Sequence, residues 1–286
     1  MKILKAMCAA AVALSLVGCA QTSNSDDKLT KVTLMLDYTP NTNHTGFYVA
    51  KNKGYYKEAG LDVDIIEPGD NATTSMVAAG KADFGVSYQE DVTYALTSEE
   101  AVIKAVMNEA GADFSKLNIV GSDGSGIAGL SDEVGKNKVN LGWEFYGWAI
   151  IKAMQDGYDL NYMPLADLDS RLDYYTPVII TNNKMIKKNS DTIQKFMEAT
   201  KKGYEYAIDH PSKAAEILHD DALTDTDLKF LKESQKYLSS QYAKDADSWG
   251  VMKDSVWDNY TDFMYETGLI DHKIDAKDQY TNEFVK

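Results

Sequence analysis

The sequence predicts an α/β protein built around a parallel sheet and divided into two lobes. At the start of the folded region, strand-like segments at residues 31–37 and 61–66 lie on either side of a helical segment at residues 45–60. A strand, a helix and a second strand in this order form the unit that builds parallel sheets. The region after residue 28 is 258 residues long (286 − 28). Because single cores stop growing near roughly 250 residues, this length favours two lobes.

The strands are predicted from runs of β-branched and alternating apolar residues that end in turn signals. Residues 31–37 are rich in strand formers and lead into Pro40 and Asn41, and residues 61–66 alternate between apolar and acidic side chains. Further strands are predicted at residues 82–88, 117–120, 138–143, 160–165 and 176–182.

Helices are predicted between these strands and through the C-terminal third of the chain. Apolar residues recur at helical spacing in residues 45–60, with breaks at Gly54 and Gly60, and further helices are expected at residues 71–79, 99–110 and 145–155. Beyond Lys184 the pattern is helical, with breaks at Asn189, Pro211, Thr224 and Ser239. The last helix carries an apolar stripe that we interpret as core packing, made of Trp249, Met252, Val256, Trp257, Tyr260, Phe263 and Met264.

The N-terminus has the pattern of a lipoprotein export signal. Lys2 and Lys5 precede an apolar run, at residues 6–17, that is too short to span a membrane, and Cys19 follows a small residue. We expect a signal peptide at residues 1–18, lipid attachment to Cys19 and a flexible polar tether at residues 19–28. With a lipid on Cys19, the mature protein would be anchored to the outer face of the cytoplasmic membrane. A plain secretory signal is the alternative.

The charge and cysteine content exclude several function classes. The formal net charge is −15, and it becomes −17 (27 − 44) once residues 1–18 are removed. This balance repels phosphate backbones and anionic headgroups, so neither nucleic acid nor direct membrane-surface binding is expected. Cys8 and Cys19 are the only cysteines, and no metal-ligand or cofactor motif is found in the sequence. Arg171 is the only arginine, which disfavours an oxyanion ligand.

The candidate site lies at the carboxyl ends of the predicted strands, where open parallel sheets bind ligands. Three strand ends place aromatic side chains beside polar ones. These candidates are Asp37, Tyr38, Asn41, Asn43, His44, Tyr88, Glu90, Tyr146 and Trp148. The tyrosine and tryptophan faces would stack on a flat heteroaromatic ring, and Asp37 and Glu90 would accept its N–H groups. The alternatives are lobe packing for each aromatic side chain, a helix-start charge for Glu90 and a capping role for His44.

The run Leu36-Asp-Tyr-Thr-Pro-Asn-Thr-Asn-His-Thr-Gly46 resembles the extracellular solute-binding proteins of ABC importers. The nearest subgroup binds hydroxymethylpyrimidine, the thiamine pyrimidine precursor, and its aminopyrimidine relatives. Similarity resumes in residues 145–148, 173–182, 196–207 and 249–269. The resemblance implies a two-lobed periplasmic-binding-protein type II fold and adds Tyr174 to the candidate ligand residues.

This chain departs from the resembled family in three places. The family commonly has tryptophan where Tyr38 stands, and often glutamate where Tyr146 stands. About 40 family residues are missing between Ala95 and Ala101. We therefore expect a reduced second lobe at residues 97–175, with lobe 1 formed by residues 29–96 and 176–286.

The sequence thus predicts a lipid-anchored receptor that binds a small aminopyrimidine and delivers it to an ABC permease, without a cofactor or a chemical step. A receptor for sulfonate, nitrate or riboflavin on the same fold is the first alternative. A pyrimidine-synthesising enzyme and a structural lipoprotein without a ligand are alternatives of other classes.

Overall fold

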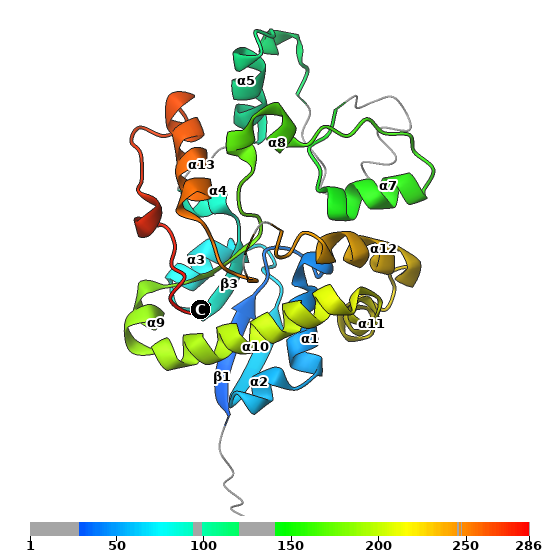
Figure 1. The fold of residues 1–286 in the computed structure, drawn as a ribbon, viewed down its shortest axis with the longest axis vertical. Helices are drawn as coiled ribbons and strands as arrows, with labels where there is room; N and C mark the ends of the chain where they lie inside the picture. Colours follow the sequence, from blue (N-terminus) through cyan, green and yellow to red (C-terminus); the bar gives the residue numbers. More distant parts are fainter. Residues whose placement is uncertain (1–28, 94–98, 120–140, 245, 247, 286) are drawn as a thin grey trace, which may run out of the picture.

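The computed structural model describes residues 29–93, 99–119, 141–244, 246 and 248–285. The predicted signal peptide, Cys19 and the tether lie outside the described residues. A four-stranded sheet in the order β2-β1-β3-β4 lies among helices (Figure 1). Its strands are β1 (Thr30–Met35), β2 (Leu61–Ile66), β3 (Phe84–Ser87) and β4 (Val178–Thr181). Strand β1 is parallel to β2 and β3, and β4 is antiparallel to β3.

The strands follow the predicted apolar patterns. In β2, Leu61 and Val63 are buried whereas Asp62 and Asp64 are exposed, because successive side chains of a strand point to opposite faces of the sheet. Strand β3 is buried along its whole length, since α3 packs on it and the ring of Phe84 stacks on Phe196 of α10 at a centroid distance of 3.9 Å.

The helices agree with most of the predicted ones. Before β4 they are α1 (Thr45–Asn52), α2 (Tyr55–Glu58), α3 (Thr73–Ala78), α4 (Gln89–Val92), α5 (Glu99–Glu109), α7 (Ile151–Gln155) and α8 (Leu165–Leu168). After β4 they are α9 (Asn183–Lys188), α10 (Ser190–Asp209), α11 (Pro211–Ala222), α12 (Leu228–Ser239) and α13 (Asp254–Glu266). Single turns are η1 (Thr42–His44), η2 (Phe114–Lys116), the π-helical η3 (Tyr146–Ile150), η4 (Ser170–Leu172) and η5 (Ala276–Asp278).

Helices α1 and α10 cross at a contact between two glycines. A Cβ atom on Gly203 would lie 2.1 Å from the carbonyl oxygen of Gly46, and one on Gly46 would overlap the ring of Tyr204. The phenol of Tyr204 donates a hydrogen bond of 2.7 Å to the carbonyl of Asn43. This close approach fixes the start of α1, and with it the turn that precedes it.

A second core lies away from the sheet. Val102 and Ala105 of α5 pack with Leu172 of η4 and with Tyr260 and Phe263 of α13. Figure 1 shows α5, α8 and α13 together in its upper part, above the sheet. The predicted apolar stripe is core as expected at Trp249, Trp257, Tyr260, Phe263 and Met264, but α13 begins at Asp254, so Trp249 and Met252 precede the helix. The predicted boundaries of the two lobes stay a prediction.

Three predicted strands of the second lobe are wrong in their described parts. Residues 117–119, 141–143 and 160–164 form no strand, and residues 120 and 138–140 lie outside the described part of the chain. A strand needs a partner for its backbone N–H and C=O groups, and apolar alternation alone does not supply one. Several apolar side chains here are exposed as a result, namely Ile119, Leu141, Phe145, Tyr162 and Met163.

Among the described residues, no helix combines the length and the apolar character that crossing a membrane requires.

Candidate functional site

The candidate site begins with Asp37, just after β1. Its Oδ1 lies 2.6 Å from Nε2 of His44, and its Oδ2 accepts the hydroxyl hydrogen bond of Tyr88. Because β1 and β3 are parallel neighbours, their carboxyl ends share one edge of the sheet, which brings Asp37 and Tyr88 together as the sequence predicts. Burial alone would raise the pKa of Asp37, but the hydrogen bonds from His44 and Tyr88 hold the pKa below its usual value of 3.8.

The turn at residues 41–44 is a reciprocal cap. The side chain of Asn41 accepts a hydrogen bond from the backbone N–H of Asn43, and the backbone N–H of Asn41 donates to Nδ1 of His44 at 3.2 Å. With Nδ1 occupied as an acceptor, His44 carries its proton on Nε2 and donates it to Asp37. His44 is fully buried, so both ring nitrogens are used within the protein.

A pair of aromatic rings faces across the site. The rings of Tyr88 and Phe145 are nearly parallel, at 17°, with centroids 6.5 Å apart. Phe145 is 50% exposed. A flat ring inserted between two others needs about 7–8 Å, twice the optimum carbon–carbon separation. The 6.5 Å between the two centroids is the upper limit of the gap between the ring planes, so a flat ligand enters only if Phe145 moves outward by about 1 Å or more. Phe145 was not among the predicted ligand residues, although it follows the predicted strand end at residue 143.

The segment that carries Phe145 is held by α12. Ser234 of α12 lies 2.5 Å from the hydroxyl of Thr42 and donates to the carbonyl of Gly147. A Cβ atom on Gly147 would lie 2.9 Å from Leu238. The buried Ser234 thus joins η1 to η3, and this connection brings residues 42 and 147 to the same place. π-Helical turns such as η3 are frequent at functional sites.

The other predicted residues take different positions. Tyr38 is 54% exposed beside Asp37, and Glu90 lies half-buried in the first turn of α4. Tyr146 packs against Tyr162 and Tyr237, at centroid distances of 4.8 and 4.7 Å. The remaining two aromatic residues pack in the protein: Trp148 lies edge-on against Phe230, and Tyr174 lies against Tyr260. The structure therefore brings together the first two strand ends and Phe145, and it gives Trp148 and Tyr174 packing contacts.

The electrostatic environment of the ring pair is negative. Burial and the charges of Asp37, Asp91 and Glu90 raise the pKa of the Tyr88 hydroxyl well above its usual value. Glu144, directly before Phe145, is half-buried, and burial raises its pKa. Such surroundings favour a ligand that donates N–H groups and disfavour an anion.

Arg171 is engaged by carboxylates that are not among the candidate site residues. Its guanidinium donates to Asp169, to both oxygens of Glu109 at 2.8 and 3.0 Å, and to Glu266 at 2.6 Å. It also lies over the ring of Phe263. Three carboxylates therefore occupy the only arginine of the chain, and they tie α5 and η4 to α13.

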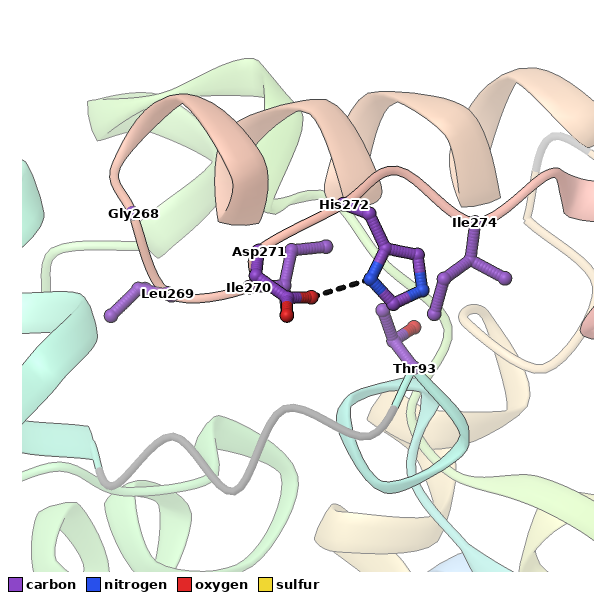
Figure 2. A pocket seen from close by; sticks show the side chains of 7 residues that line it. All are labelled: Thr93, Gly268, Leu269, Ile270, Asp271, His272 and Ile274. Carbon is purple, nitrogen blue, oxygen red and sulfur yellow. Dashed lines mark hydrogen bonds and ion pairs between the residues drawn. The ribbon is translucent and has the colours of Figure 1, made fainter.

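A cavity of about 410 Å³ opens at the end of α13 (Figure 2). It is lined by Thr93, residues 268–272 and Ile274. His272 and Asp271, which are hydrogen-bonded to one another at its rim, are both mostly exposed. None of the predicted ligand residues lines this cavity.

Comparison with known proteins places the chain in a family. The family described as NMT1/THI5 like matches residues 41–98 and 92–214, which is more than half of the chain. The chain belongs to the NMT1/THI5-like family. The site residues from Asn41 to Tyr174 fall within the matched region, and Asp37 and Tyr38 lie just before it.

Some relatives are named as a binding protein and others as synthases. The formylaminopyrimidine-binding protein of Halalkalibacterium halodurans is 26% identical over 298 residues, covering 82% of this chain and 88% of that protein. The 4-amino-5-hydroxymethyl-2-methylpyrimidine phosphate synthase THI11 of Saccharomyces cerevisiae is 24% identical over 312 residues, covering 89% of this chain and 88% of that protein. The family resemblance expected from the sequence is confirmed.

The fold is that of the periplasmic binding proteins. The crystal structure of the periplasmic aliphatic sulphonate binding protein SsuA from Escherichia coli matches with a TM-score of 0.62 at 11% identity. The match covers 90% of this chain and 99% of SsuA. The predicted fold class is confirmed by this likeness.

This chain is shorter than its relatives inside the matched region. The alignment with the Halalkalibacterium protein is 298 positions long and includes 82% of the 286 residues of this chain, or about 235 residues. Roughly 60 aligned positions therefore have no residue in this chain. The two parts of the family match meet at residues 92–98, where the sequence predicts the missing segment.

Proposed function

We propose that this protein is the solute receptor of an ABC importer and that it binds a small aminopyrimidine between Tyr88 and Phe145. The observation that carries the proposal is this ring pair, nearly parallel and 6.5 Å apart, in a negative environment. Aromatic faces stack on a flat heteroaromatic ring, and carboxylates accept its amino hydrogens. The name of the Halalkalibacterium relative supports the same ligand class.

Arg171 argues against the sulfonate alternative. Planar recognition of a sulfonate usually recruits arginine, and the only arginine of this chain is surrounded by Asp169, Glu109 and Glu266. An anion at Tyr88 would also be repelled by Asp37 and its neighbours. The likeness to SsuA therefore concerns the fold, and we do not propose a sulfonate as the ligand of this protein.

The proposal includes no chemical step, although some relatives are named synthases. A general base needs a nitrogen or oxygen lone pair that faces the substrate. In His44, Nδ1 accepts from Asn41 and Nε2 donates to Asp37, and the imidazole is buried. This arrangement supports a structural role for His44 in a binding protein.

Thermal unfolding of the purified protein with added compounds tests the proposal. At 100 times its dissociation constant, 4-amino-5-hydroxymethyl-2-methylpyrimidine should stabilise the protein by about 2.7 kcal/mol, and an alkanesulfonate should have no effect. Stabilisation by the sulfonate, or by neither compound, would contradict the proposal.

We also propose that the receptor is anchored outside the cytoplasmic membrane through a lipid on Cys19 and that it delivers its ligand to a permease. The basic start, apolar run and cysteine of residues 1–19 support the anchor. Cys19→Ala should move the protein from the membrane fraction to the soluble extracytoplasmic fraction. Equal membrane retention of both forms would contradict the lipid attachment.

A further inference from the structure

Both oxygens of Asp37 are already hydrogen-bonded within the protein. Oδ1 accepts a hydrogen bond from the Nε2–H group of His44, and Oδ2 accepts a hydrogen bond from the hydroxyl group of Tyr88. Only 10% of the Asp37 side chain is exposed. The lone pairs that remain on this carboxylate are therefore largely shielded from a ligand.

These hydrogen bonds join three segments that are far apart in the sequence. Asp37 follows β1, His44 belongs to the turn before α1, and Tyr88 follows β3. The backbone N–H of Asn41 closes the chain of hydrogen bonds at Nδ1 of His44. One carboxylate thus sets the position of the 41–44 turn and of the Tyr88 ring together.

The geometry points to Asp37 as a positioning residue. It holds the Tyr88 ring parallel to Phe145, and it receives no hydrogen bond from the ligand. This inference rests on the proposed function and refines it, because Asp37 was predicted from the sequence to accept the amino hydrogens of the ligand. The ring face of Tyr88 meets the ligand, while its hydroxyl is used by Asp37.

The first experiment measures the affinity of two pyrimidines, 4-amino-5-hydroxymethyl-2-methylpyrimidine and the same compound without its amino group. Wild type, Asp37→Asn, Tyr88→Phe and the double variant are compared by calorimetry. Each single variant should lose about tenfold in affinity, and the double variant should lose about the same rather than a hundredfold, because both changes break one contact. Loss of the amino group should cost wild type and Asp37→Asn the same factor, within about twofold.

The second measurement needs no ligand and separates positioning from general stability. In nuclear magnetic resonance spectra, His44 of the wild type should show a protected Nε2 proton and an unprotonated Nδ1, and Asp37→Asn should weaken that protection. Asp83→Asn is the matched control, since Asp83 is a half-buried carboxylate that accepts a backbone hydrogen bond from Thr33 at 2.9 Å. It should leave both the His44 signals and the pyrimidine affinity unchanged.

Three outcomes would overturn the inference. An amino-group effect that disappears in Asp37→Asn would show direct contact between Asp37 and the ligand. If the affinity losses add up in the double variant, or if the His44 signals are unchanged in Asp37→Asn, Asp37 does not act through Tyr88 and His44. If the wild-type protein binds neither pyrimidine while the His44 signals are as expected, the proposed function is refuted. The proposed role of Asp37 in ligand binding is then refuted as well.

Discussion

Replacing Phe145 tests the ring pair directly. Half of the side chain is exposed, which for a phenylalanine leaves about 100 Å² free, and a flat ligand on one face would cover about 50 Å² of it. At about 25 cal/mol per Å² this contributes roughly 1.2 kcal/mol, and stacking adds about 0.5–1.5 kcal/mol. Phe145→Ala should therefore weaken pyrimidine binding by roughly 20- to 100-fold.

Two further substitutions separate the contributions. Phe145→Leu keeps most of the apolar area and should lose only the stacking part, about 2- to 12-fold in affinity. Leu141→Ala is the control, because Leu141 is 48% exposed in the same segment. It should change affinity by less than about twofold.

Isothermal titration calorimetry measures the affinities, and urea unfolding checks that each variant is folded. Because Phe145 is half exposed, its replacement should lower the free energy of unfolding by less than about 1 kcal/mol. Wild-type affinity in a folded Phe145→Ala protein would refute the assignment of this ring to the ligand.

Three other perturbations follow from the structure. Gly203→Ala places a Cβ 2.1 Å from the carbonyl oxygen of Gly46. It should lower the free energy of unfolding, measured in urea, by about 1–3 kcal/mol. An unchanged value would contradict the close crossing of α1 and α10. Arg171→Leu should lower the free energy of unfolding by about 1–2 kcal/mol, because three partly exposed carboxylates lose their partner. Its pyrimidine affinity, measured by calorimetry, should be unchanged. The pKa of Asp37 is lowered in the folded state, so its contribution to stability is present above pH 3.8 and is lost as the pH falls through the lower folded value. Acid unfolding followed by circular dichroism should therefore be less steep below pH 3.8 in Asp37→Asn, and identical curves would contradict the shift.

Local patterns sufficed to predict much of the sheet and the C-terminal helices. Alternation in residues 61–66 and strand formers in residues 31–37 act within each segment, and the ends of β1 and β3 meet because parallel neighbours share an edge. The same rule predicts that Asp37 lies near Tyr88. Apolar spacing likewise identified the buried face of α13.

Features that depend on distant partners were not predictable in this way. Asp37 is predicted to accept N–H groups of a ligand, and its hydrogen bond with Tyr88, 51 positions away, does not follow from its own segment. Trp148 is predicted as a ligand face with lobe packing as the alternative, and the Phe230 ring of α12 that it packs against is 82 positions away (230 − 148). The strands expected at residues 138–143 and 160–165 have apolar patterns but no ladder partner in the described residues.

The way in which Phe145 is held differs from what the sequence predicts. A strand is predicted at residues 138–143, shortly before Phe145, but residues 141–143, the part of it that the structure describes, form no strand. Instead, Gly147 packs on Leu238, and Ser234 bridges Gly147 to Thr42. The separation of Tyr88 from Phe145 is therefore set by α12, which packs against η1 beside the sheet edge. Because α12 holds Phe145 through Gly147, a flat ligand enters between Tyr88 and Phe145 only when this contact allows the Phe145 ring to move outward by about 1 Å or more.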